Sequence, residues 1–330
     1  MATYKGINGF AVQSVASDPS PLDEGQVWYN NATYAFKLAT LTTTGTWASG
    51  GNLTTARKYL AGAGTQTSAL AMGGFTTVDV TNTEEYDGTS WSPGGNLATA
   101  RNRSGGAGTQ TAGLIFGGQT PTPVAPNDMT GITEEYDGSS WTTGGTMATA
   151  RASLAPAGTQ TAALGAGGQL YPGAATSAVE EYDGTSWTTG GSLTTGRYAL
   201  SGCGTQTAAL GFGGSPSPTA TEEYDGTSWT AGGNLNTGRR YLAGAGTQTA
   251  ALAFGGTPPP GFLTATELYN GTSWTSNPSG LNTGRYGLAG AISGTQSLTA
   301  AFGGSTPSNT AATEEWTGPG SPTTKTITTS

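Results

Sequence analysis

Short runs of alternating hydrophobic and polar residues fill most of this chain, and turn-forming residues separate them. One stretch after Arg57 reads YLAGAG (59–64), SALAMGG (68–74), NTEEYDG (82–88) and SWSPGGNL (90–97). Runs of this length with a period of two predict four short β-strands. The Asp-Gly pair between the last two runs is typical of a tight hairpin turn. No stretch has the apolar spacing of an amphipathic helix, so we expect almost no helix.

The four-strand pattern returns along the chain with small changes. Trp recurs every 42 to 50 residues, an Arg follows each Trp after ten or eleven residues, and a Gly-Gly pair closes each second strand. The repeat tryptophans are Trp47, Trp91, Trp141, Trp187, Trp229 and Trp274. The repeat arginines are Arg57, Arg101, Arg151, Arg197, Arg239 and Arg285. A period of this length is that of a four-stranded propeller blade.

Side-chain size differs systematically between the strands of a repeat. The first strand is made of small residues in every copy, which suits the crowded strands nearest a propeller axis. Each repeat tryptophan, with a Leu or Met six or seven residues beyond it, is expected to fill the wider gap between blades. These aliphatic residues are Leu53, Leu97, Met147, Leu193, Leu235 and Leu281.

The order of Gly-Gly, aromatic residue, Trp and Arg over about 46–318 resembles the kelch-repeat family. The resemblance implies an all-β, six-bladed propeller of four-stranded blades. Because the first Trp strand precedes any Gly-Gly strand and the last acidic strand lacks a Trp strand, residues 46–53 are expected to complete the blade formed by 286–318. The expected division is an attachment segment (1–45), a propeller (46–318) and a C-terminal tail (319–330).

Composition excludes several function classes. The net charge of −8 disfavours a nucleic-acid partner, and no apolar run is long enough to insert into a membrane. One Cys and no His exclude disulfide frameworks, zinc sites and Ser-His-Asp or Cys-His catalysis. We therefore expect no metal, no cofactor and no enzymatic activity. Cys203 replaces Ala or Pro of other repeats, which predicts a packed small residue rather than a reactive thiol.

The repeated EEYDG–Trp segment brings acids and aromatic residues together, as a catalytic cluster does. Six near-identical copies around a ring cannot each be an active site, so we interpret them as structure. The turn aspartates Asp87, Asp137, Asp183 and Asp225 are expected to shape hairpins, and the Glu pairs to meet the repeat arginines. The alternative is that the six arginines converge at one mouth of the channel and bind an anion.

The connections between the second and third strands vary from seven to fifteen residues, whereas the other hairpin turns barely change. In an up-and-down blade, these connections and those leading to the next blade emerge on one face. Variable loops on a rigid scaffold commonly carry recognition, although plain loop drift is the alternative. The candidate ligand-binding residues on this face are Phe75, Asp79, Asn127, Asp128, Tyr171 and Phe262.

The N-terminal segment reads as a separate hairpin over 24–40, with alternating apolar residues around an Asn-Asn-Ala turn: Val27, Tyr29, Tyr34, Phe36 and Leu38. With the beginning MATYKGINGF, the GTQTAALAFGG repeats and the ending EEWTGPGSPTTKTITTS, it is similar to kelch-like tail- or fibre-type structural proteins of marine, cyanophage-like viruses. The resemblance implies a virion protein that attaches to other virion proteins through 1–45, and it allows a homo-oligomer in the particle. The lack of a signal-peptide core in the first residues agrees with assembly inside the host cell.

Three functional hypotheses follow. The first is a non-enzymatic virion component, associated with tail or capsid, that displays the propeller and contacts a glycan or protein of the host surface. The second is a carbohydrate-binding module that uses the variable face. The third is a glycan-active enzyme, which requires two neighbouring carboxylates on that face; only Asp79 and Asp128 are available in its connections.

Overall fold

The computed structural model describes residues 12–20, 26–41, 44–121, 128–258, 261–320 and 322–327. Its described residues form strands, turns and loops without a helix. The chain divides into two compact units, Met1–Gly45 with Gly318–Ser330, and Thr46–Thr317. Among the described residues no helix is long and apolar enough to cross a bilayer.

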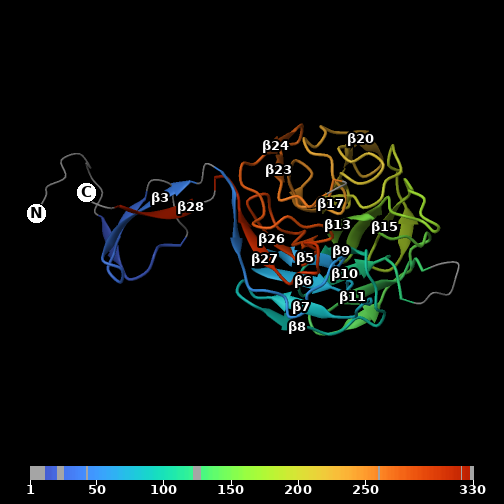
Figure 1. Ribbon diagram of the computed structural model, residues 1–330, viewed down its shortest axis with the longest axis horizontal. Helices are drawn as coiled ribbons and strands as arrows, with labels where there is room; N and C mark the ends of the chain where they lie inside the picture. The colour runs from blue at the N-terminus through green and yellow to red at the C-terminus, as the bar shows by residue number, and fades with distance from the viewer. Residues whose placement is uncertain are drawn as a thin grey trace, which may run out of the picture. The chain divides into compact units, whose positions relative to one another are not determined.

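The larger unit contains six four-stranded sheets in a propeller-like arrangement, and Figure 1 shows β5, β9, β13 and β17 near its centre. The first strands are β5 (Ala61–Thr65), β9 (Gly105–Gly108), β13 (Ala155–Thr159), β17 (Ser201–Thr205), β21 (Ala243–Thr247) and β25 (Ala289–Gly290). The second strands are β6 (Ser68–Met72), β10 (Gly113–Phe116), β14 (Ala162–Ala166), β18 (Ala208–Phe212), β22 (Ala250–Phe254) and β26 (Leu298–Phe302).

The outer half of each sheet carries the acidic strand and the Trp strand. The third strands are β7 (Thr83–Tyr86), β11 (Thr133–Tyr136), β15 (Val179–Tyr182), β19 (Thr221–Tyr224), β23 (Thr266–Tyr269) and β27 (Thr313–Thr317). The fourth strands are β8 (Trp91–Pro93), β12 (Trp141–Thr143), β16 (Trp187–Thr189), β20 (Trp229–Ala231), β24 (Trp274–Ser276) and β4 (Thr46–Ser49). These strands are shorter than the sequence predicts, because the Gly-Gly pairs and the segment after each Trp leave the ladder.

The last sheet takes its outer strand from the beginning of the unit. β4 pairs antiparallel with β27, and Trp47 lies opposite Trp316. This is the pairing that the sequence predicts for 46–50. The first strands also contact one another in sequence, and β25 contacts β5.

The first strands consist of small residues because their backbones approach one another closely. A Cβ built on Gly62 would lie 2.3 Å from the carbonyl oxygen of Gly290, and one on Gly202 would lie 2.6 Å from that of Pro156. Neither contact is possible for a real side chain. The predicted reason for the small residues, crowding near the centre, is therefore confirmed.

The repeat tryptophans pack between neighbouring sheets, as expected. Trp91 contacts Phe302 with ring centroids 4.8 Å apart, and its indole N–H donates to Thr313 Oγ1 at 2.9 Å. Both partners belong to the preceding sheet. Five repeat tryptophans are buried, and Trp141 is half-buried.

A seventh four-stranded sheet belongs to the described part of the smaller unit, where the sequence predicts only a hairpin. Its order is β1 (Gln13–Val15), β2 (Val27–Asn30), β3 (Ala35–Leu41) and β28 (Pro322–Ile327), and β1 is parallel to β2. The predicted hairpin is present as β2 and β3. The C-terminal residues, expected as a separate tail, contribute β28 to this sheet.

The buried face of the smaller sheet differs from the expected one. Trp28 is fully buried and donates its indole N–H to Asp18 Oδ1, which also accepts from Asn30. The predicted apolar face instead leaves Tyr29 half-buried and Phe36 exposed. Trp28, on the opposite side of the strand, is the residue that the alternation did not single out.

Candidate functional site

The acidic repeats and the repeat arginines form six buried ion pairs. Arg197 Nη2 lies 2.8 Å from Glu222 Oε1, and its other terminal nitrogen donates to the backbone carbonyls of Gly213 and Ala220. The pairs are Arg57–Glu84, Arg101–Glu134, Arg151–Glu180, Arg197–Glu222, Arg239–Glu267 and Arg285–Glu314. Burial lowers the pKa of each guanidinium, while the carboxylate partner raises it.

The ion pairs exclude the repeat arginines as an anion site. Their side chains are fully buried, and none lines either of the two cavities described below. Cys203 is also fully buried, and burial raises the pKa of its thiol to about 12, as expected for a packed residue rather than a nucleophile. The described residues contain no group of three or more acidic or Cys side chains suited to a metal ion.

The uniform turns connect neighbouring sheets. One Gln in each first turn donates its side-chain N–H groups to two backbone carbonyls of the preceding sheet; Gln110, for example, donates to Ala69 and Tyr86. The turn Gln residues are Gln66, Gln110, Gln160, Gln206, Gln248 and Gln296. Each turn aspartate accepts the backbone N–H groups of the residues two and three positions later, which lowers the pKa of the aspartate. The predicted turn role is confirmed, and these side chains serve the scaffold.

The opposite face opens on a central channel whose mouth is built by equivalent residues, two positions after each repeat arginine. We call them the mouth ring: Tyr59, Arg103, Ser153, Ala199, Tyr241 and Gly287. The N–H of each donates to the carbonyl of the ring residue before it at 2.7–2.9 Å, and Tyr59 donates to Gly287, so the bonds form a closed circle. All six have a positive φ between 53° and 60°.

The mouth ring contains strained backbone. Left-handed φ is unfavourable for non-Gly residues, above all for bulky ones such as Tyr59 and Tyr241. Gly287 is required at its position, because a Cβ there would lie 2.8 Å from the ring of Tyr59. Strain of this kind is commonly kept where it positions side chains for function.

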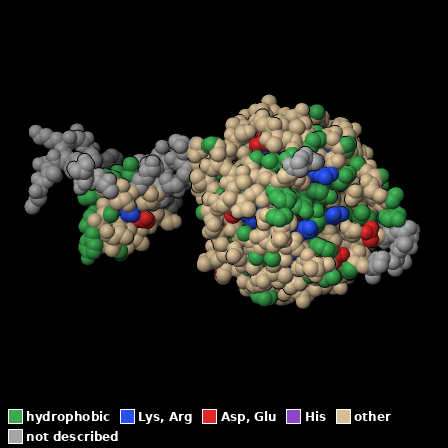
Figure 2. Space-filling model, viewed as in Figure 1, with side chains coloured by type: hydrophobic (Ala, Val, Ile, Leu, Met, Phe, Trp, Pro, Cys, Tyr) green, Lys and Arg blue, Asp and Glu red, His purple; other side chains and the backbone are tan. Residues whose placement is uncertain are grey.

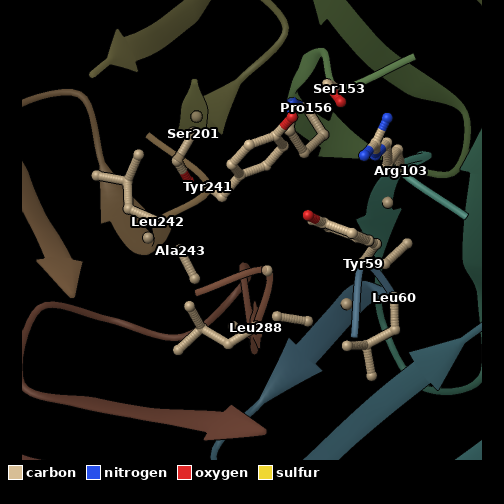
Figure 3. Close-up of a pocket in the computed structure, with 18 of the residues that line it drawn as sticks. Tyr59, Leu60, Arg103, Ser153, Pro156, Ser201, Tyr241, Leu242, Ala243 and Leu288 are labelled. Atoms are coloured by element: carbon tan, nitrogen blue, oxygen red, sulfur yellow. The ribbon is translucent and has the colours of Figure 1, made fainter. Parts of the chain in front are cut away.

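Two cavities meet at this mouth. The channel cavity, of about 110 Å³, is lined by the mouth ring and the small residues of the first strands. The side cavity, of about 440 Å³, lies beside it and is lined by Lys58, Tyr59, Phe75, Asp79, Asn102, Arg103, Gln119, Thr120, Pro121 and Asp128. Tyr59 and Arg103 line both. Figure 3 shows the Tyr59 hydroxyl and Arg103 at the edge of the channel, with Tyr241 facing them.

The side cavity holds two carboxylates supported by amide side chains. Asn102 Nδ2 donates to Asp79 Oδ1 at 2.5 Å, and Gln119 Nε2 donates to Asp128 Oδ2. Burial raises the pKa of Asp79, as does the nearby Asp128, whereas the bond from Asn102 and the charge of Arg103 lower it. The site therefore offers carboxylate acceptors next to a cation.

Aromatic rings and cations surround the mouth. The ring centroids of Tyr59 and Tyr241 are 5.2 Å apart, and Phe262 stacks on Tyr286 at 5.4 Å. The Arg103 guanidinium lies 4.6 Å from the Tyr59 ring centroid. Burial raises the pKa of Tyr59 to about 12, against the opposing charge of Arg103, so its hydroxyl keeps its proton even at alkaline pH. Figure 2 shows Lys and Arg side chains gathered among apolar ones in the middle of this face.

The predicted ligand-binding residues divide into three groups. Phe75, Asp79 and Asp128 come together in the side cavity. Tyr171 and Phe262 are 50% and 42% exposed but line neither cavity, and Asn127 is outside the described residues.

Sequence reasoning missed the mouth ring and its neighbours Lys58 and Arg240. The signal was present, because the two residues after each repeat arginine vary among the repeats while the arginine does not change. No protein-family model matches the chain, and no curated protein matches it either.

Proposed function

We propose that this chain is a non-enzymatic virion protein that presents a closed, six-bladed, kelch-like propeller and contacts a host-surface ligand with the face that carries the mouth ring. The observation that supports it is the contrast between the two faces. On one, Gln and Asp side chains are engaged in sheet-to-sheet and turn hydrogen bonds. The other holds the cavities, the exposed aromatic residues and the varied loops, and recognition commonly lies on such loops.

The six-bladed, closed form of the propeller is part of this proposal. It is supported by the pairing of β4 with β27 and by the contact of β25 with β5. The hydrogen-bonded circle of the mouth ring agrees with it. In this proposal the smaller unit, which contains residues 1–45 and β28, attaches the propeller to other virion proteins.

Binding without cleavage is the form of recognition that we propose. Asp79 and Asp128 meet the minimum requirement of the enzyme alternative, since both line the side cavity. Each carboxylate already accepts a hydrogen bond from an amide side chain, an arrangement suited to holding a ligand hydroxyl. Conversion of a bound oligosaccharide into shorter products would contradict this part of the proposal.

The test is to locate the protein in purified particles by mass spectrometry and immuno-electron microscopy. We expect it in stoichiometric amounts on the particle surface. Particles assembled with a chain that lacks residues 1–45 should lose the protein, while the remainder stays folded in solution. Finding the chain only as free protein, with no copy on particles, would refute the virion role.

A further inference from the structure

The cations of the larger unit are distributed unevenly. Thr46–Thr317 contains nine Lys and Arg residues, and six of them are the repeat arginines in buried ion pairs. The other three are Lys58, Arg103 and Arg240, which stand one or two positions after a repeat arginine. All three therefore lie on the connections that build the channel mouth. Within the larger unit, the cations outside the six ion pairs therefore gather at this mouth.

Arg103 has hydrogen-bond donors to spare. Its Nη1 donates to Gln119 Oε1 at a long 3.3 Å, and its buried Nε has no hydrogen-bond partner. No ion pair joins Arg103 to an Asp or Glu in the part of the chain that the structure describes. A guanidinium offers five N–H donors in a planar fork that matches a carboxylate. Arg103 therefore has donors available for a planar anion at the junction of the two cavities.

Lys58 adds a second positive charge to the side cavity, which favours an anionic ligand. Its Nζ lies 5.4 Å from the ring centroid of Tyr59 and 5.8 Å from those of Phe75 and Tyr286. Aromatic rings hold the ammonium group in place without neutralising its charge. Both cations line the side cavity without an ion pair in the described structure, although Arg103 lies near enough to Asp79 to lower the pKa of that carboxyl.

The remaining groups of the cavity favour a saccharide. Asp79 and Asp128 are acceptors that fit ring hydroxyls, which a saccharide carries beside its carboxylate and a Glu-rich peptide does not. Tyr59 and Phe75 provide apolar surfaces with, for tyrosine, a polar edge. The volume of about 440 Å³ is within the usual range of small-ligand pockets.

We propose that the side cavity binds one uronic-acid residue of an acidic polysaccharide. Arg103 receives its carboxylate in a bidentate contact, assisted by Lys58. Its hydroxyls donate to Asp79 and Asp128, and the sugar ring packs on Tyr59. This inference rests on the proposed recognition function and specifies its ligand class.

The experiment measures binding of galacturonic acid trimer to the full-length chain by isothermal titration calorimetry, with the neutral galactose trimer for comparison. The test variant is Arg103→Asn, because Asn tolerates the left-handed backbone at this position. The control variant is Lys37→Gln, which removes a cation of the smaller unit. Thermal unfolding of each variant checks that the fold is kept.

We expect the acidic trimer to bind about tenfold or more tightly than the neutral one, and Arg103→Asn to weaken it by a similar factor, as for a lost charged hydrogen bond. Lys37→Gln should bind like the unchanged chain. Raising the salt concentration should weaken binding of the acidic trimer.

Equal affinity for the two trimers, or unchanged binding by folded Arg103→Asn, would overturn the inference. So would a Glu-rich peptide that binds more tightly than the acidic trimer and loses its affinity in Arg103→Asn, since it assigns the mouth to a protein partner. If particles still carry the chain and still attach to cells in any of these cases, the proposed function stands and only the ligand class is wrong.

Discussion

At the scale of single residues, the repeat tryptophans show how one side chain links neighbouring sheets. A Thr at the start of the third strand accepts the indole N–H of the next repeat tryptophan, as Thr133 does from Trp187 at 2.9 Å. Trp229 alone among the buried repeat tryptophans has an indole N–H without a hydrogen-bond partner in the described structure. The equivalent residue of the preceding sheet is Val179, which offers no oxygen. The missing bond is therefore explained by one substitution.

Val179→Thr should stabilise the protein. It supplies the acceptor that Trp229 lacks, and a buried hydrogen bond of this kind contributes about 0.5–1.5 kcal/mol. The free energy of unfolding, measured in urea, should rise by about that amount. The reverse change Thr133→Val is the matched control and should lower it; a destabilised Val179→Thr would contradict the explanation.

At the scale of elements, neighbouring sheets are joined by a second repeated contact. The hydroxyl of Tyr86 donates to Glu315 Oε1 of the preceding sheet at 2.5 Å. The same contact joins Tyr136, Tyr182, Tyr224 and Tyr269 to Glu85, Glu135, Glu181 and Glu223. At the sixth interface between neighbouring sheets, Trp316 stands in place of the Tyr and Leu268 in place of the Glu. Both partners of the contact are therefore replaced together by apolar residues.

These tyrosines predict a loss of stability at alkaline pH. Burial, followed by the bond to Glu, raises the pKa of all five from 10.0 to about 12. The folded state therefore holds these protons more tightly than the unfolded state, and its advantage is complete below pH 10 and lost as the pH rises toward 12. The urea midpoint should stay level up to about pH 10 and then fall.

A matched variant isolates the tyrosine contribution. Tyr224→Phe removes one of the five hydroxyls, so it should be less stable at neutral pH and lose less stability between pH 10 and 12. A variant whose alkaline loss equals that of the unchanged chain would contradict the assignment to these contacts.

Strand number and order within each repeat were predictable from sequence, because they depend on local alternation and on turns such as Asp87–Gly88. The pairing of 46–50 with the last acidic strand followed from the phase of the repeat. The face on which Trp28 is buried was not predictable, since it depends on Asp18 and on a strand from the other end of the chain. The mouth ring was missed because its role depends on φ angles and on proximity between distant repeats.

At the scale of the whole molecule, two separate segments of the chain complete two different sheets. β4 completes the sheet that contains β27, whereas β28 completes the sheet of the smaller unit. The boundary between the units therefore lies immediately before β4 and immediately after β27. Two shortened chains that differ by only a few residues at this boundary should therefore differ strongly in stability.

A chain of residues 46–317 should unfold in a single transition close to that of the larger unit in the full-length protein. A chain of residues 54–317 also loses β4 and the buried Trp47, and removal of a large buried aromatic residue costs about 3–5 kcal/mol. Differential scanning calorimetry should show a markedly lower midpoint for the shorter chain. Equal midpoints would mean that β4 does not contribute to the stability of its sheet.

The closed circle of the mouth ring uses main-chain atoms only. The width of the opening is consequently independent of the five side chains that project from it, provided that each residue tolerates the left-handed backbone. Exchanging residues at 59, 103, 153, 199 and 241 then alters the chemistry of the entrance while its dimensions persist. A gene library that varies these codons among residues that tolerate the left-handed backbone and keep the N–H should yield proteins with new binding preferences on an unaltered framework.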